Sequence, residues 1–312
     1  MIYALLLLLI IITLCILRER RHVRLIIYMG TFALLASMLY FFFGSPDLAM
    51  AEAAIGAFTT IFFVICFEKY DDLKVDLKSV PTEPAPKQAR NWKRIIAPIV
   101  FTAFLFALFL YFVPSEEGSS YLKEQYLALF MDEIGGTNAV TAIYLGYRVY
   151  DTLFEALILI VSVIAVIHMS YSEDVAVDDG RHSDVERSIV VNAVMHIIPA
   201  VILLFGLYLT VNGHISAGGG FQGGLFIAAF FVCRYLIYDV FDLPIRKAFR
   251  LEEFIFSFTV VFVIFVIFLG ALDYFPPVFQ EVYMIVMNLL IGLKVACGFI
   301  ILFYRYIAIE RR

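Results

Sequence analysis

Nine long apolar segments, separated by short polar stretches, restrict the fold of this chain more than any other feature. They cover roughly residues 2–17, 23–43, 46–67, 95–113, 151–169, 189–211, 221–238, 254–272 and 284–304. A helix needs about 20 consecutive apolar residues to cross the hydrocarbon core of a bilayer. The composition agrees, because 62% of the residues are hydrophobic and only 16% are charged, against about 45–50% and about 25% in soluble chains. The pattern predicts an all-α, polytopic integral membrane protein with about nine transmembrane helices.

Two apolar stretches differ from ordinary membrane-spanning segments: the first segment and residues Thr137–Tyr147. A secretory signal peptide carries its positive charges before its apolar run. Here the arginines follow the first segment, so we expect an uncleaved first transmembrane helix. A further apolar stretch, Thr137–Tyr147, is too short to cross a bilayer, and we expect it to form a short interfacial or re-entrant helix.

The positions of Lys and Arg predict the orientation. Under a nine-helix count, most of the 23 basic residues fall in the loops after the first, third, fifth and seventh segments and in the C-terminal tail. The opposite side carries Lys123 and Arg148. Basic loops stay in the cytoplasm. We therefore expect a cell-membrane protein with its N-terminus outside and its C-terminus in the cytoplasm.

Two hydrophilic stretches predict cytoplasmic linkers. Residues 71–94 are charged and rich in proline, and residues 171–188 are acidic and poor in apolar residues. They would divide the chain into a three-helix module (1–70), a two-helix module (95–170) and a four-helix module (189–312). The basic residues form no continuous face, so a nucleic-acid partner is not expected. No motif predicts a cofactor or a metal site.

Asp47 and Glu52 place two carboxylates beside apolar segments. In the stretch "SPD", Ser45 can cap a helix whose first residue is Pro46, and Asp47 then lies in the first turn, near the positive end of the helix dipole. A capping role and a place in an ion path are both open for Asp47. Glu52 lies about 9 Å further along the helix than Pro46. No cap explains it, and burial disfavours its charged form, so we expect it to line an ion path.

Lys294 and Glu155 are the other charged residues predicted to lie within the membrane. Lys294 lies about 15 Å into the last segment if that helix starts at residue 284. Intramembrane charges are costly and are usually paired, hydrated or functional. An ion path and a static ion pair both explain Lys294, and the same alternatives apply to Glu155. Arg148 lies three residues before Asp151, so we expect these two side chains to form a structural ion pair.

A glycine-rich stretch, "NGHISAGGGFQGGLF", precedes the seventh apolar segment. It lacks the lysine of a phosphate-binding loop. Irregular backbone within a membrane is tolerated only inside protein or along a wet cavity. We therefore expect a loop that dips inwards and lines a cavity, formed by His214, Gly218, Gly219, Gly220, Gly223 and Gly224.

Three sequence stretches resemble parts of Mrp-type Na⁺/H⁺ antiporters. "SPDLAMAEAAIGAF" resembles a three-helix segment near the C-terminal end of the large antiporter subunit and the separate MbhD-like subunit of membrane-bound hydrogenase-like complexes. "GGTNAVTAIYLGYRVYDTLFEALILIV" is similar to the MbhE-like segment that follows it. "GHISAGGGFQGGLFIAA" and "NLLIGLKVACGF" resemble the four-helix MnhB/MrpB-like subunit. One departure is Ala217, where the family usually has proline before the glycines.

The resemblance implies a non-catalytic subunit of an ion-translocating complex. Its partners would be other Mrp-like antiporter subunits and hydrogenase-like redox subunits, and its ions Na⁺ or H⁺. It also implies that Glu52 and Lys294 line the ion route. The fusion of the first two modules to the MnhB-like module, rather than to a large antiporter subunit, favours a redox-driven respiratory complex.

Two other functional classes are weighed against an ion path. The chain could be a structural scaffold of a free-standing multisubunit antiporter, with static buried ion pairs. It could also be an intramembrane enzyme, which would need a nucleophile with a base or a metal motif such as H-E-x-x-H. The sequence shows neither, so an enzyme is not expected.

Overall fold

A computed structural model describes the backbone of residues 1–77, 92–111, 116–169, 189–238, 245–271 and 277–309. These residues form helices joined by short turns, and this part of the chain contains no strand. The helices are α1 (Ile2–Arg18), α2 (His22–Phe42), α3 (Pro46–Leu77), α4 (Trp92–Tyr111), α5 (Glu116–Glu133), α6 (Ala139–Ala142), the π-helix η1 (Ile143–Tyr147), α7 (Val149–Met169), α8 (Ile189–Asn212), α9 (Gly220–Tyr238), α10 (Ile245–Ala271) and α11 (Pro277–Ile309).

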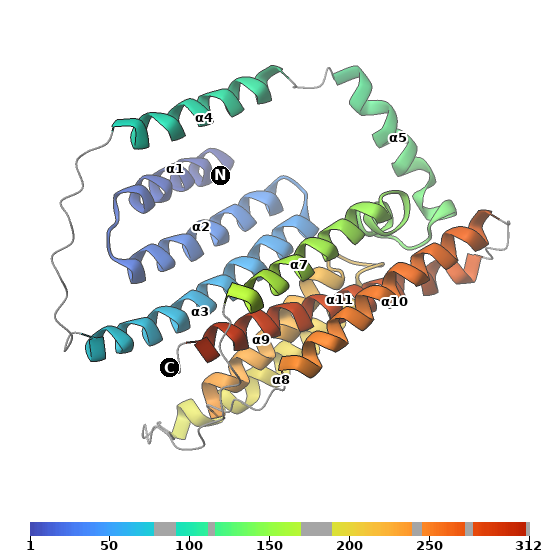
Figure 1. The fold of residues 1–312 in the computed structure, drawn as a ribbon. Helices are drawn as coiled ribbons and strands as arrows, with labels where there is room; N and C mark the ends of the chain where they lie inside the picture. Colours follow the sequence, from blue (N-terminus) through green and yellow to red (C-terminus); the bar gives the residue numbers. More distant parts are fainter. Residues whose placement is uncertain (78–91, 112–115, 170–188, 239–244, 272–276, 310–312) are drawn as a thin grey trace.

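Helices α1, α2 and α3 form two successive antiparallel hairpins (Figure 1). At the first turn, the Glu19 carboxylate accepts hydrogen bonds from the backbone N–H groups of Arg20 and Arg21. These two hydrogen bonds lower the pKa of Glu19 below its usual value, and the bond from Arg21 has the larger effect. The second turn, at Gly44, leads directly into α3, which starts at Pro46 as the "SPD" stretch predicts.

Helix α11 is the centre of the second group of helices. It packs against α9, α10, α7 and α8, and it also touches α3 (Figure 1). Its buried face supplies large side chains to the core: Met284, Met287, Ile301, Phe303 and Tyr304. Helix α3 packs against α9, so the N-terminal hairpins and the C-terminal helices share one interface.

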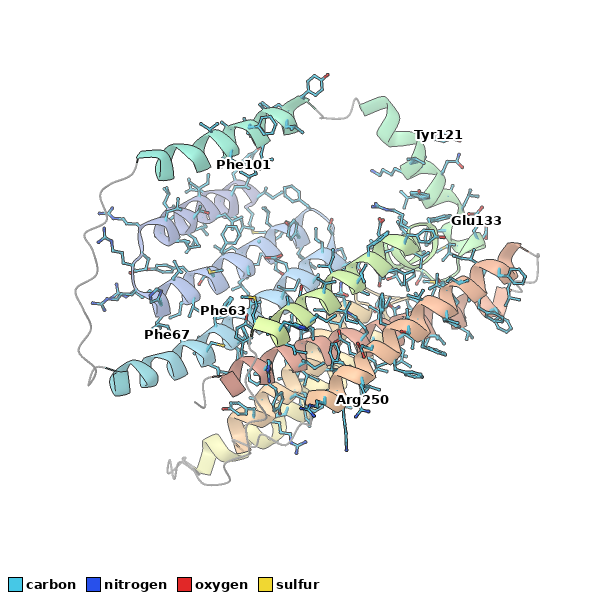
Figure 2. All side chains as sticks on the ribbon, viewed as in Figure 1. Phe63, Phe67, Phe101, Tyr121, Glu133 and Arg250 are labelled. Carbon is cyan, nitrogen blue, oxygen red and sulfur yellow. The ribbon has the colours of Figure 1, made fainter. Side chains whose placement is uncertain are left out.

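Helices α4 and α5 lie at the edge of the structure (Figure 1). Every side chain of α4 that the structure describes is exposed, and apolar groups such as Phe101 project from it (Figure 2). Helix α5 is absent from the sequence interpretation, which places only the short helix Thr137–Tyr147 between the fourth and fifth segments. Polar and charged residues are spread along α5, so it carries no membrane signal that would indicate a helix.

The prediction of an all-α, polytopic membrane protein is confirmed. Within the described residues, five helices are long and apolar enough to cross a membrane, and three shorter apolar helices accompany them. Two helices start earlier than predicted: α10 at Ile245 rather than 254, and α11 at Pro277 rather than 284. The predicted linker 71–94 lies partly within α3 and α4, and the whole of 171–188 lies outside the described residues.

Candidate ion-pathway site

Lys294 is buried where α11 meets α7 and α10. Its ammonium group donates a hydrogen bond to the backbone carbonyl of Ala156 on α7. It also lies 3.4 Å from a carboxylate oxygen of Glu252 on α10, and the two side chains are 2% and 0% exposed. Because α11 begins at Pro277, Lys294 is close to the middle of a 33-residue helix. The structure therefore joins three helices through one buried cation.

Glu252 is the functional candidate that the sequence interpretation missed. Neither of its carboxylate oxygens has a hydrogen-bond partner among the described residues beyond the ion-pair contact with Lys294. Gly298 of α11 lies beside it, because a Cβ added there would be 3.1 Å from the carboxylate. Buried side-chain polar atoms usually have at least one hydrogen-bond partner. Glu252 is thus held by charge more than by a fixed hydrogen-bond network.

Glu155 adds a second carboxylate to this cluster. It precedes Ala156 on α7 and interacts electrostatically with Lys294. Unlike Glu252, it is exposed at the surface of the chain. The structure therefore brings two of the predicted path residues, Lys294 and Glu155, to one site, and we call Glu155, Glu252 and Lys294 the lysine cluster.

Asp47 lies at a second site, where all three predicted modules meet. One carboxylate oxygen accepts a hydrogen bond of 2.9 Å from the Asn138 side chain and one of 3.1 Å from the Gly218 N–H. The Asp47 backbone carbonyl lies 3.5 Å from the side-chain nitrogen of Gln222. Asp47 therefore joins the start of α3 to the turn before α6 and to the loop before α9.

His214 holds the same loop from its other side. The side chain is buried, with one ring nitrogen 3.0 Å from the Val211 carbonyl and the other 3.4 Å from a carboxylate oxygen of Glu281. The His214 carbonyl accepts the backbone N–H groups of Thr137 and Asn138. This residue connects the loop between α8 and α9 to the start of α11 and to the turn before α6.

Only two of the five glycines lie in the loop, which corrects the prediction. Gly218 and Gly219 have φ angles of 151° and 143°, which favour glycine. Gly220, Gly223 and Gly224 lie within α9. A Cβ on Gly223 would meet Thr210 of α8, and one on Gly224 would meet the Gly292 carbonyl of α11. These three glycines permit close helix packing and do not form a loop around a cavity.

A partly buried polar cluster contacts this loop. The Tyr144 hydroxyl is 3.2 Å from the Asn288 side-chain oxygen and 3.4 Å from the Thr141 hydroxyl. Asn288 also accepts the Gly220 N–H at 3.0 Å. Thr141 donates to the Gly213 carbonyl. The cluster therefore ties η1 to the loop and to α11, and we call Thr141, Tyr144 and Asn288 the tyrosine cluster.

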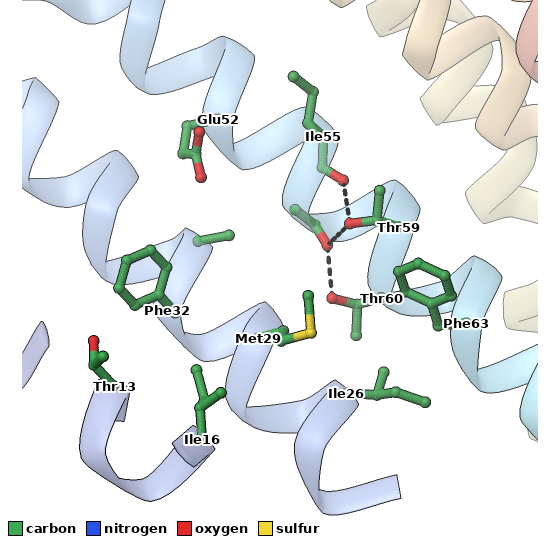
Figure 3. A pocket seen from close by; sticks show the side chains of 12 residues that line it. Thr13, Ile16, Ile26, Met29, Phe32, Glu52, Ile55, Thr59, Thr60 and Phe63 are labelled. Atoms are coloured by element: carbon green, nitrogen blue, oxygen red, sulfur yellow. Dashed lines mark hydrogen bonds between the residues drawn. The ribbon is translucent and has the colours of Figure 1, made fainter. Parts of the chain in front are cut away.

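Glu52 lies apart from both clusters, in the α1–α3 hairpins. It lines an open, mostly apolar cavity of about 430 Å³ between these helices. Figure 3 shows its carboxyl group on the side of the cavity where Phe32 lies. Thr59 and Thr60 also line the cavity, but their hydroxyls donate to carbonyls of their own helix (Figure 3). Glu52 is the charged residue of this cavity.

Arg148 and Asp151 form an ion pair at the start of α7. Both side chains are more than half exposed, and ion pairs of this kind contribute about 0–1 kcal/mol to stability.

Among the described residues, no group of three or more His, Cys, Asp or Glu side chains could hold a metal ion.

The missed residues have physical explanations. Glu252 is next to Glu253, just before the predicted eighth segment, so both resemble charges at a membrane surface. Because α10 starts earlier, both lie within this helix, and adjacent helix residues point in different directions, so the structure buries Glu252 and exposes Glu253. Asn138, Tyr144 and Asn288 are uncharged, and only the tertiary fold brings them together.

Family models match two parts of the chain. The model for a domain related to the MnhB subunit of Na⁺/H⁺ antiporters matches residues 190–310, and the MbhD model, which represents a subunit of MBH, matches residues 7–72. The putative antiporter subunit mnhA2 of Staphylococcus aureus (strain JH9) is 27% identical over 163 residues. That match covers 52% of this chain and 19% of the relative, so the chain spans about a fifth of the curated relatives it matches.

Two solved structures share the fold. The Mrp complex from Dietzia sp. DQ12-45-1b has a chain that matches with a TM-score of 0.60 and 19% identity, over 95% of this chain and 34% of that one. The archaeal membrane-bound sulfane sulfur reductase has a chain that matches with a TM-score of 0.52 and 25% identity, over 69% of this chain and 98% of that one. The fold and these matches define a multi-pass helical membrane protein with regions similar to subunits of Na⁺/H⁺ antiporters. More specifically, one polypeptide carries a region that matches the MbhD model and a region that matches the model of the MnhB-related domain.

Proposed function

We propose that this subunit contributes a Na⁺ or H⁺ path to its antiporter module, with the lysine cluster at the centre of the path. The observation that carries the proposal is the Lys294–Glu252 pair, buried between α7, α10 and α11. Asp47 and Glu52 are proposed as further groups of the path. The chain itself is proposed to catalyse no covalent reaction, and any redox chemistry would belong to separate subunits.

The cluster has the chemistry that such a path needs. Moving two charges out of water costs several kcal/mol per ion even after relaxation. Lys294 offsets this with one carbonyl and one carboxylate, while Glu155 supplies a second carboxylate within electrostatic range. A cation or proton that neutralises either carboxylate would weaken its attraction for the ammonium group. The Lys294 ammonium group could then move between the Glu155 and Glu252 carboxylates. Its position would thus depend on which carboxylate holds a cation or proton.

The alternative is a static scaffold in which the pair only fixes helix packing. Buried ion pairs do serve this purpose in some proteins. The incomplete hydrogen bonding of Glu252 favours the path, because a fixed structural pair is expected to satisfy its remaining acceptors.

Neutral variants test the proposal. The full chain is assembled with the other subunits of its module in membrane vesicles, and Na⁺ uptake and proton movement are measured for Lys294→Met and Glu252→Gln. Each should lower coupled flux at least about tenfold, a cost of about 1.4 kcal/mol in the rate-limiting barrier. Subunit composition on a native gel controls for assembly. Wild-type flux in both variants would refute the path.

We further propose the orientation and the setting of the complex. The N-terminus is placed outside and the C-terminus in the cytoplasm, from the distribution of basic residues. A redox-driven complex is supported by the match to the MbhD model and by the likeness to a subunit chain of an archaeal respiratory complex. The three modules, 1–70, 95–170 and 189–312, are proposed to correspond to separate subunits in related complexes.

Affinity purification of the tagged full chain from its native membrane tests the setting. Co-purification of iron–sulfur subunits, seen as low-temperature electron paramagnetic resonance signals, is the expected result. Recovery of antiporter subunits alone would show a free-standing exchanger.

A further inference from the structure

Tyr144 contacts both the loop that carries Gly218 and Gly219 and the helix α7, which carries Glu155. Tyr144 interacts electrostatically with both Asp47 and Glu155. Asp47 belongs to the loop site and Glu155 to the lysine cluster. Tyr144 is thus within electrostatic range of one carboxylate at each charged site.

The backbone fixes this position through α7. The Thr152 hydroxyl donates to the Tyr144 carbonyl at 2.6 Å. One turn further along α7, about 6 Å away, the Ala156 carbonyl accepts the Lys294 ammonium group. The same buried face of α7 therefore contacts the tyrosine cluster and the lysine cluster in succession.

The loop is shaped around the Tyr144 hydroxyl. A Cβ on Gly219 would come within 2.3 Å of that oxygen, so glycine is required for the hydroxyl to fit. The hydroxyl donates to the Asn288 oxygen at 3.2 Å. The Thr141 hydroxyl, 3.4 Å away, either donates to it or, while its own hydrogen is on the Gly213 carbonyl, can accept from it. The Tyr144 hydroxyl can therefore reorient between Asn288 and Thr141 without leaving its site.

Asn288 contributes a second, independent observation. Its side-chain oxygen is occupied, but its side-chain nitrogen is buried and has no hydrogen-bond partner among the described residues. An unsatisfied buried donor is costly. An amide that lacks an acceptor next to a reorientable hydroxyl is suited to hold a water molecule, which would extend the hydrogen-bonded chain.

From this geometry we propose that Tyr144 is a proton-relay residue between the Asp47 site and the lysine cluster. In each transfer, the protonated form of one carboxyl group, Asp47 or Glu155, gives its proton to the phenol oxygen while the phenol gives its own proton to the other carboxylate, with water bridging the gaps. Tyr144 therefore returns to the neutral phenol and no charge accumulates on it. Asn288 and Thr141 orient the hydroxyl. This inference rests on the proposed function and adds a named residue to its path.

The test compares two tyrosines that lose a hydroxyl. Tyr144→Phe removes the relay group and keeps the ring. Tyr283→Phe is the matched control, because the Tyr283 hydroxyl donates to the Leu145 carbonyl at 2.8 Å in the same buried region but has no place in the relay. In assembled vesicles, proton flux should fall roughly tenfold or more in Tyr144→Phe, in the range of lost acid–base groups, and stay within about twofold of wild type in Tyr283→Phe. Equal fluxes in the two variants would overturn the relay.

A second measurement separates a relay from packing. Fluorotyrosine introduced at position 144 keeps the hydroxyl and its hydrogen bonds but makes the phenol more acidic. A relay then loses its proton at lower pH, so the alkaline limb of the pH–flux profile should shift to lower pH. An unshifted profile would overturn the relay even if Tyr144→Phe fails to assemble. If Lys294→Met abolishes flux while both tests at 144 leave it unchanged, the relay fails and the proposed path stands. If Lys294→Met and Glu252→Gln both transport normally, the path itself fails.

Discussion

Lys294 and Glu252 place two opposite charges where almost no solvent reaches them. The contribution of such a pair to stability depends on whether both charged partners are present. Removing one partner of a buried ion pair destabilises a protein by about 3–5 kcal/mol, whereas replacing both by neutral groups is often close to neutral. This asymmetry can separate a structural role from a transport role at these two positions.

The double variant Lys294→Met/Glu252→Gln applies this asymmetry. We expect the thermal midpoint of the solubilised complex to fall in each single variant, by the equivalent of about 3–5 kcal/mol, and to recover in the double variant. Flux should stay low in the double variant, because the mobile charges are gone. Recovery of both stability and flux would show that the pair is a static scaffold.

Asp47 makes its contacts through one oxygen, which predicts different outcomes for two substitutions. Asparagine keeps an acceptor oxygen for the Asn138 and Gly218 donors, whereas alanine leaves both without it. Hydrogen bonds to a charged group contribute about 1.5–3 kcal/mol each. We expect Asp47→Asn to assemble nearly as wild type and Asp47→Ala to assemble poorly, as measured by the yield of intact complex. Equal yields would contradict a linking role for Asp47.

At the scale of helices, glycine sets how closely α8, α9 and α11 approach each other. A Cβ on Gly223 would lie 2.0 Å from the Thr210 hydroxyl and 2.7 Å from the Gly206 carbonyl, so the helices would have to separate. Gly270 of α10 is a matched control, because a Cβ there meets nothing within 4 Å.

We therefore expect Gly223→Ala and Gly270→Ala to act in opposite directions. Overpacking typically costs about 1–3 kcal/mol, so Gly223→Ala should lower the thermal midpoint of the solubilised protein. Alanine is a better helix former than glycine by about 1 kcal/mol, so Gly270→Ala should leave the midpoint unchanged or raise it. A stable Gly223→Ala variant would contradict the close packing of α8 and α9.

The helix positions and the site residues differ in how far the sequence predicts them. Apolar segments of membrane length indicate helices directly, so the all-α fold and most helix positions follow from the pattern. The start of α10 does not follow from this pattern, because the charged residues in its first turns interrupt the apolar run. The part of the helix that positions Glu252 is therefore not predicted. Lys294 is recognisable from its charge alone, but Tyr144 is one of 18 tyrosines, and only the packing of η1 against α11 distinguishes it.

The three predicted modules pack directly against one another and are not separate units joined only by linkers. Asp47, Asn138 and Gly218 belong to different modules and meet at one hydrogen-bonded point, and α11 packs against helices of all three. Such a fusion places all helices in one membrane with a fixed relative orientation. An experiment that determines the side of one loop therefore fixes the side of every other loop.

Cysteine labelling in sealed vesicles of known sidedness tests this orientation. The native cysteines at 15, 66, 233 and 297 are first replaced by serine or alanine. Lys123→Cys on α5 and Arg250→Cys on α10 then place single thiols at exposed positions on opposite predicted sides. An impermeant maleimide should label position 123 from outside and position 250 only from the cytoplasmic side, because basic loops stay in the cytoplasm. Labelling of both positions from the same side would mean that the nine-helix count is wrong by one. Labelling of position 123 from the cytoplasmic side and of position 250 from outside would invert the orientation, and the Asp47 site would then lie at the cytoplasmic entrance of the path.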